Sequence, residues 1–75
     1  MKFVEMTGRS LLLIVSDDEM SAAELVTAGV ADETVVRVNQ HGDIEIRRSE
    51  GWDIIGGLLG NYEERIHRQT GCKWA

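Results

Sequence analysis

Val36-Arg37-Val38-Asn39-Gln40-His41-Gly42-Asp43-Ile44-Glu45-Ile46 is the stretch that decides the fold, because it predicts a β-hairpin. Apolar and polar residues alternate on both sides of a three-residue turn, Gln40-His41-Gly42, in which glycine supplies the left-handed conformation that such turns need. The resulting register places three pairs opposite one another: Val38 with Ile44, Val36 with Ile46, and Arg37 with Glu45. We therefore expect a hairpin within Thr34–Arg48 that has one buried face and one solvated face.

The sequence before this hairpin predicts a second one. Residues Met1–Met6 can form a strand, and Thr7-Gly8 is a plausible tight turn. The following segment, Arg9–Ser16, carries five consecutive apolar residues, which is typical of a central strand. We expect the two strands to pair through the turn.

A helix is expected between the two hairpins, although its first residue is ambiguous. Two capping boxes occur one after the other, Ser16-Asp17-Asp18-Glu19 and Ser21-Ala22-Ala23-Glu24, and either one can begin the helix. Gly29 is expected to end it, because glycine favours the left-handed conformation that often follows a helix.

After the hairpin, the sequence predicts a long helix that begins at Ser49 or Glu50 and ends near Thr70, with Gly71 as its C-cap. A short tail carrying Trp74 follows it. Five apolar residues recur at the spacing of one helix face: Trp52, Ile55, Leu59, Tyr62 and Ile66.

Three glycines lie off this apolar stripe, at Gly56, Gly57 and Gly60. Each glycine inside a helix costs about 1 kcal/mol relative to alanine, so three would cost about 3 kcal/mol. Three interpretations remain open. The glycine face packs tightly within the monomer, it contacts a second copy of the helix, or the helix breaks at Gly56-Gly57.

Together these elements predict an α+β fold in a single domain over residues 1–75. We expect a small antiparallel sheet of about four strands with two helices on one face, in the order β-β-α-β-β-α. The two halves are similar in outline, so an internal duplication is an alternative to a coincidental arrangement. The 43% hydrophobic and 28% charged content is typical of a globular protein.

Charge and cysteine content limit the classes of function. The net charge of −5 and the pI near 4.8 disfavour generic binding to nucleic acid or anionic membranes. The single cysteine, Cys72, excludes a disulfide within the chain and favours a reducing cytoplasm. The longest apolar run, Leu11–Val15, is too short to span a bilayer, and no signal-peptide pattern is found at the N-terminus.

No motif in the sequence predicts an enzyme, a metal site or a cofactor. The glycine cluster lacks the lysine of a phosphate-binding loop. His41, His67 and Cys72 are too few for a structural zinc site, and a thiol that follows a helix C-terminus is poorly placed as a nucleophile. We expect the acidic run Asp17-Asp18-Glu19 to cap a helix and to lie in solvent.

The sequence favours a non-enzymatic module that binds proteins through its C-terminal helix, as a homodimer or as a subunit of a larger assembly. The partner-binding residues expected on that helix are Trp52, Gly56, Gly57, Gly60 and Tyr62. A wide apolar stripe that four short strands cannot cover would leave an exposed patch of the kind that marks a partner site.

The alternative function is nucleic-acid binding, or binding of an acidic partner, through the basic residues of the hairpin. Those residues are Arg37, His41, Arg47 and Arg48. The stretch 36–46 resembles the hairpin of AbrB-like transition-state regulators, which implies a swapped dimer that binds DNA. Arg47 stands where that family usually has proline, and the helix expected after it is unlike the short helix of the family.

Overall fold

The hairpin forms with the register that its sequence predicts. The structure is a computed structural model that describes residues 2–72. Strands β2 (Val35–Asn39) and β3 (Asp43–Arg48) are antiparallel, and Gly42 in their turn adopts a left-handed φ of 86°. The observed pairs are the expected ones: Val36 with Ile46, Arg37 with Glu45, and Val38 with Ile44.

The chain has the expected α+β class, but its elements follow a different order. In chain order they are β1 (Phe3–Thr7), α1 (Gly8–Ile14), α2 (Ala22–Thr27), β2, β3, β4 (Gly51–Gly57) and α3 (Tyr62–Thr70). The four strands form one antiparallel sheet in the order β1-β2-β3-β4. The expected order β-β-α-β-β-α is therefore wrong, and residues 2–72 contain three helices rather than two.

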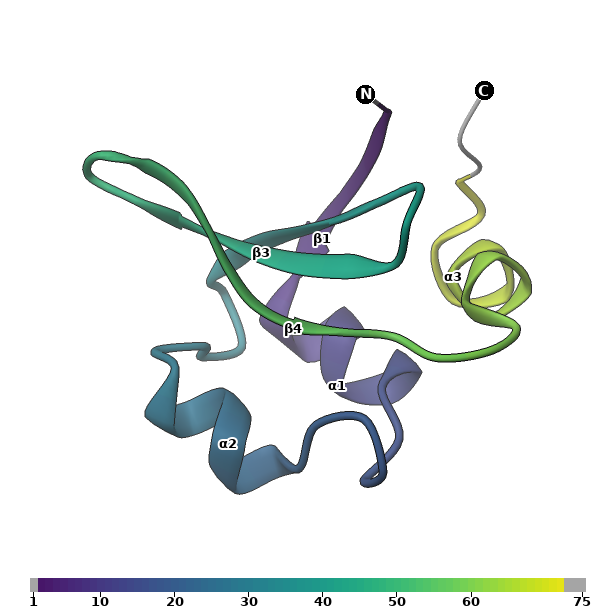
Figure 1. Ribbon diagram of the computed structural model, residues 1–75, viewed down its shortest axis with the longest axis horizontal. Helices are drawn as coiled ribbons and strands as arrows, with labels where there is room; N and C mark the ends of the chain where they lie inside the picture. The colour runs from purple at the N-terminus through teal and green to yellow at the C-terminus, as the bar shows by residue number, and fades with distance from the viewer. Residues whose placement is uncertain (1, 73–75) are drawn as a thin grey trace.

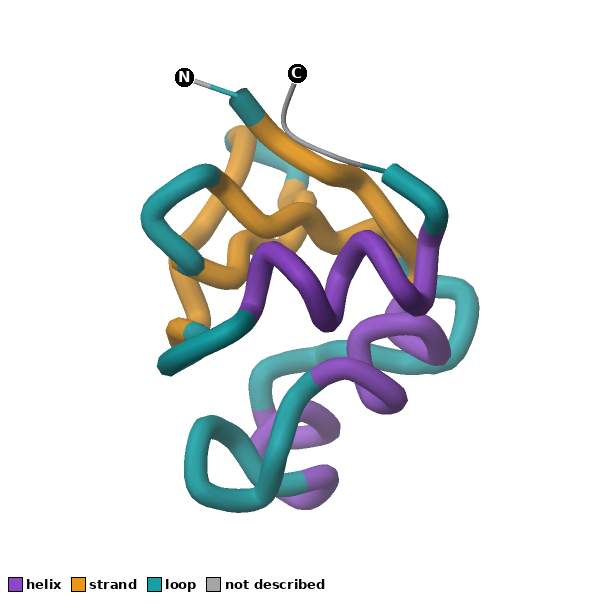
Figure 2. Tube along the Cα trace, turned by 90° about the vertical axis from the view of Figure 1, so that its right-hand side faces the viewer, coloured by secondary structure: helices purple, strands orange, loops and turns teal. Residues whose placement is uncertain are grey.

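Helices α1 and α2 lie beneath the sheet, and α3 lies beside the β2–β3 turn, as Figures 1 and 2 show. The buried apolar side chains of the strands point to this covered face, where they meet Leu11 and Ile14 of α1, Leu25 of α2 and Ile66 of α3. The buried apolar strand residues are Val4, Val36, Val38, Ile44 and Ile46. Within residues 2–72 no helix covers the opposite face of the sheet.

The apolar run that was expected to form a central strand forms helix α1 instead. Leu11 and Ile14 are buried, whereas Leu12 and Leu13 between them are 47% and 65% exposed. This is the spacing of one helix face, which a run of only five apolar residues cannot distinguish from a buried strand. Thr7, expected in a hairpin turn, is the N-cap of α1 and accepts a hydrogen bond from the backbone N–H of Ser10.

Helix α2 begins at the second of the two candidate capping boxes. The Ser21 side chain and the Glu24 side chain each accept a hydrogen bond from the backbone N–H of the other residue. At the first box the Glu19 side chain accepts a hydrogen bond from the Ser16 N–H, but the Glu19 N–H donates to the Ser16 carbonyl, and the segment forms only a turn. Gly29 follows the helix with a φ of 97°, as its position predicts.

The long C-terminal helix is the second error of the sequence interpretation, because its first part is strand β4. This strand carries a β-bulge: Glu45 pairs with Ile54 and Ile44 pairs with Gly56, so Ile55 between them has no partner on β3. Strand alternation places Ile55 on the covered side, where it packs against the core, while Ile54 stays 61% exposed on the opposite face, and the bulge brings Gly56 to the covered side as well. The three-residue spacing from Trp52 to Ile55, which suggested one helix face, therefore joins the two faces of a strand.

The three glycines do not lie on a helix face. Gly56 and Gly57 lie in β4, and Gly60 lies in the loop before α3. A Cβ atom at Gly56 would lie 2.9 Å from the Met20 sulfur, so a bare backbone suits this position. Of the three interpretations, the break is the one that the structure supports.

The last helix is short, and its C-cap is the expected one. Gly71 adopts a φ of 76° and donates its N–H to the carbonyl of His67. The first half of the chain, strand–helix–helix, does not repeat in the second half, so the structure gives no sign of a duplication. The expected tail residue Trp74 lies outside the described residues. No helix within residues 2–72 is long and apolar enough to cross a membrane.

Gly8 provides a test of how α1 is seated against the segment that precedes β2. A Cβ atom there would lie 2.0 Å from the Ala31 carbonyl oxygen and 2.6 Å from the Val30 side chain. We expect Gly8→Ala to lower the free energy of unfolding by about 2–3 kcal/mol, because backbone must move to accept it. Gly60→Ala, with no atom within 4 Å, should change it by less than about 0.5 kcal/mol in the same urea titration.

Candidate functional site

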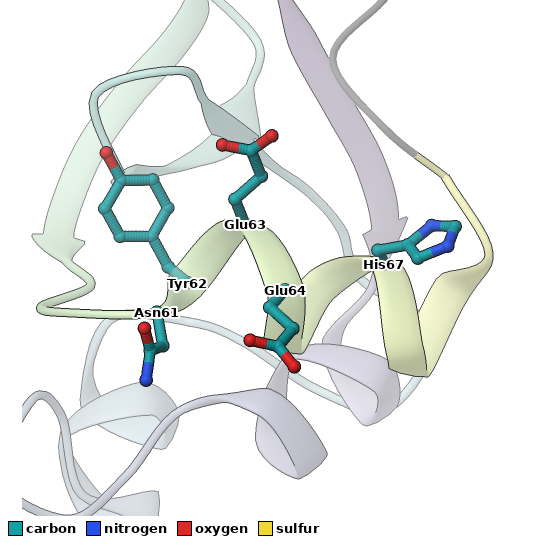
Figure 3. Close-up of a pocket in the computed structure, with 5 residues that line it drawn as sticks. All are labelled: Asn61, Tyr62, Glu63, Glu64 and His67. Carbon is teal, nitrogen blue, oxygen red and sulfur yellow. The ribbon is translucent and has the colours of Figure 1, made fainter.

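A hollow at the start of α3 is lined by several polar and ionisable side chains and is therefore a candidate active site. Asn61, Tyr62, Glu63, Glu64 and His67 line it. Figure 3 shows that their polar groups diverge: the two carboxylates point to opposite sides of the helix, and the imidazole points away from both. The Tyr62 hydroxyl donates to the carbonyl of Gln40 in the β2–β3 turn. This arrangement anchors α3 to the sheet and does not bring reactive groups together on one substrate atom.

A buried ion pair between Glu19 and Arg65 is the strongest electrostatic feature of the molecule. The Arg65 guanidinium contacts both carboxylate oxygens, at 2.9 and 2.6 Å, and also donates to the carbonyls of Ile14, Leu59 and Gly60. The Glu19 side chain, only 3% exposed, accepts further hydrogen bonds from Ser16 and from the Leu59 backbone. All its polar atoms are committed to the fold, so the pair is structural.

The hydrogen bonds from Arg65 lower the pKa of Glu19 from 4.5 to about 2, against the opposing effect of burial. The sequence interpretation placed Glu19 in a solvated acidic run, which is wrong for this residue and correct for its exposed neighbours Asp17 and Asp18. Nothing local in the sequence marks Glu19 as different, because its partner lies 46 residues away. Within residues 2–72, no group of three or more His, Cys, Asp or Glu side chains is placed to hold a metal ion.

The basic residues of the hairpin do not form one patch. Arg37 and Arg47 lie on the uncovered face of the sheet, whereas Arg48 points to the helix side, where it contacts Asp53 and the Ala28 carbonyl. His41 is in the turn at the opposite end of β3 from Arg47 and Arg48. The four residues grouped in sequence are therefore separated in space.

The residues expected to bind a partner are also dispersed. Trp52 lies on the uncovered face, Gly56 faces Met20 on the covered face, and Gly57 lies beside the Gly42 carbonyl. Gly60 is in an open loop, and Tyr62 is half-buried against the β2–β3 turn. Of the five, only Trp52 contributes a side chain to the surface described next, at one end of which Gly57 pairs with Asp43.

The uncovered face of the sheet, called the open face below, combines exposed apolar side chains with stacked and ion-paired ones. The register assigns to it Phe3, Glu5 and Thr7 of β1, Val35, Arg37 and Asn39 of β2, Asp43, Glu45 and Arg47 of β3, and Trp52 and Ile54 of β4. Three of its apolar side chains are exposed, by 36% for Phe3, 40% for Val35 and 61% for Ile54.

A stack of three side chains crosses the centre of the open face. The Cζ atom of Arg37 lies 3.5 Å from the centroid of the Phe3 ring and 4.0 Å from that of Trp52, so the guanidinium sits between two aromatic rings. The rings come from the two edge strands, β1 and β4. The stack therefore holds both edges of the sheet to its middle.

Charge at the centre of the open face is neutralised within the sheet. Arg37 donates from Nε and Nη2 to one oxygen of Glu45, at 3.3 and 3.0 Å. Asn39 donates to the other Glu45 oxygen and to Asp43. Glu45 and Asn39 are buried, and no buried side-chain polar atom within residues 2–72 lacks a partner. The charged and polar groups at the centre of the face therefore satisfy one another within the sheet.

The sequence interpretation found Arg37, Glu45 and Trp52 but not the role of Phe3. The alternation Phe3-Val4-Glu5-Met6-Thr7 was a usable signal, because it places Phe3 and Glu5 on the face opposite the buried Val4. Trp52 was assigned to a helix, which hid its relation to Arg37.

No protein-family model matches this chain, and comparisons with curated proteins and with solved structures find no match either.

The Glu19–Arg65 pair predicts how stability depends on pH. Because the pKa of Glu19 is lower in the folded state than the ordinary value of 4.5, its contribution is complete above pH 5 and is lost as the pH falls towards 2. The difference corresponds to about 3 kcal/mol. Urea titrations from pH 7 to pH 2 should show a shallower loss in Glu19→Gln than in the wild type. Glu33→Gln, at an exposed glutamate, should follow the wild-type curve.

The stack predicts that Arg37 cannot be replaced by lysine without loss. A lysine ammonium is not planar and cannot stack between the two rings while it bonds to Glu45, so Arg37→Lys should lower the free energy of unfolding by about 1–2 kcal/mol. Arg47→Lys, on the same face but exposed, should change it by less than about 0.5 kcal/mol. Equal losses in both variants, measured by urea denaturation, would contradict a structural role for the stack.

Proposed function

We propose that this protein is a non-enzymatic interaction module that binds another protein through the open face of its sheet. The observation that carries the proposal is the exposure of Phe3, Val35 and Ile54 around the half-buried Trp52 on a face that no described helix covers. Exposed apolar side chains gathered on one surface are typical of protein-binding sites.

The residue types at the centre of the face support the same function. Tryptophan and arginine are the residues that most often dominate the energy of protein interfaces. Here Trp52 and Arg37 are held by stacking and by Glu45, so little conformational freedom would be lost when a partner binds. A binding surface with its central side chains already ordered is an efficient one.

The arrangement of reactive groups supports a binding rather than a catalytic role. The histidine and carboxylates at the start of α3 diverge, and the Glu19–Arg65 pair is enclosed by hydrogen bonds from the fold. The free thiol of Cys72 is exposed, which suits a reducing cytoplasm as the place of action. The proposed interaction surface includes Trp52, as the sequence suggested, but it lies on the sheet and not on the C-terminal helix.

Photo-cross-linking in the cells that naturally contain the protein would test this function. A benzophenone side chain replaces Ile54 on the open face in one variant and Leu59 in the other. The two positions are equally exposed, at 61% and 65%, but Leu59 lies outside the open face. We expect a discrete protein adduct from position 54 and none from position 59.

The position of the adduct shows whether the open face binds a protein, and its identity shows which protein is bound. An adduct at position 54 with any protein, including another copy of this chain, supports the proposed function. Absence of adducts at position 54, or the same adducts from both positions, would contradict it. Far-ultraviolet circular dichroism of each purified variant checks that the fold is retained.

A further inference from the structure

Two exposed charged side chains of opposite sign lie unpaired on the open face. Glu5 of β1 and Arg47 of β3 make neither an ion pair nor a side-chain hydrogen bond with any residue between 2 and 72. The other charged residues of the face are committed: Arg37 and Glu45 to each other, and Asp43 to Asn39. Glu5 and Arg47 are therefore available to a partner.

The sheet geometry prevents these two residues from pairing with each other. Glu5 lies opposite Arg37 on β2, whereas Arg47 lies one step beyond the Val36–Ile46 pair, beside Val35. They are thus separated by two strand spacings across the sheet and by about two residues along it, or roughly 12 Å. The midpoint between them falls on β2 at the level of Val36, with Arg37 on one side of it and the exposed Val35 on the other.

We propose that the partner of the open face is a second copy of this chain, bound face to face about a two-fold axis that passes over β2 between Arg37 and Val35. This inference rests on the proposed function of the face. A two-fold axis lying between the sheets exchanges the positions of Glu5 and Arg47, so Glu5 of each copy meets Arg47 of the other. Stacked sheets lie about 10 Å apart, a gap that a glutamate and an arginine together can bridge.

The apolar residues of the face fit the same arrangement. Val35 lies near the axis and meets its counterpart, while Phe3 and Ile54 lie towards the two edges of the sheet. Four strands at about 4.8 Å spacing give a face only about 19 Å wide. A flat face of this width covers less than the roughly 800 Å² per partner of a standard interface, so we expect the dimer to be weak and to depend on concentration.

Charge reversal tests the proposal because, in a two-fold interface, each single substitution changes both Glu5–Arg47 contacts at once. In Glu5→Arg two arginines meet at both contacts, and in Arg47→Glu two glutamates meet at both. Each variant alone should dimerise at least about tenfold more weakly than the wild type. In an equimolar mixture of the two variants, every arginine meets a glutamate, so the mixture should dimerise as the wild type does.

Sedimentation equilibrium across a range of protein concentrations measures all of these states. The double variant Glu5→Arg/Arg47→Glu should also recover wild-type association, because both contacts are restored with their signs exchanged. Glu33→Arg provides the matched control, since it makes the same charge change at an exposed site outside the sheet and should not weaken the dimer.

Three results would overturn the proposal. The wild-type protein remains monomeric at millimolar concentration, both charge-reversal variants dimerise as strongly as the wild type, or the equimolar mixture dimerises as weakly as the single variants. The first of these needs no variant and so does not depend on how a variant folds. A monomer whose position 54 still cross-links to a different protein would remove the second copy and leave the proposed function intact. A monomer with no adduct at position 54 would remove both.

Discussion

The register of the β2–β3 hairpin is the constraint on which the rest of the structure depends. Side chains alternate between the two faces of a strand, so a slip by one residue would exchange the faces completely. Val36 and Val38 would then meet water, and Arg37 and Glu45 would face the helices without enough polar partners. The turn glycine at position 42 and the Arg37–Glu45 pair hold one register, and that register creates both the core and the open face.

Placement of the C-terminal helix depends on a different kind of interaction. Arg65 joins α3 to the end of α1, to the turn that carries Glu19 and to the loop before α3 itself. Because Glu19 is buried with this one cation, removing either partner would leave a charge without compensation in a place that water reaches poorly. The pair therefore fixes one position of α3 against the rest of the chain, whereas Ile66 supplies the apolar contact there.

Local signals predicted the parts of the fold that depend on neighbours in sequence. The hairpin, the Ser21–Glu24 capping box and the glycine stops at 29 and 71 were all confirmed, because each is set by residues within a few positions. The two errors arose where short apolar runs fit either period. At residues 11–14 only the neighbouring sheet decides which side chains are buried, and at residues 52–55 apolar side chains from both faces of a strand have the spacing of one helix face.

The contrast between local signals and tertiary contacts also explains which parts of the candidate site could be predicted from the sequence. The Arg37–Glu45 pair follows from register alone, whereas the stack needs Phe3 and Trp52, which lie 49 residues apart on opposite edges of the sheet and meet only through Arg37. The glycine cost of about 3 kcal/mol was a sound physical warning that a helix over residues 51–60 was unfavourable. Propensity identified the conflict there, but only the tertiary contacts of β4 with β3 and Met20 resolved it.

An exposed apolar face can associate unspecifically, and the unpaired charges on this face limit such association. Apolar contact alone is indifferent to orientation, so Phe3, Val35 and Ile54 would accept many partners. Glu5 and Arg47 lose hydration wherever a partner offers no opposite charge, which penalises most arrangements and favours the few that supply both signs at the right separation. The apolar side chains thus provide attraction, and the two unpaired charges restrict which surface can make use of it.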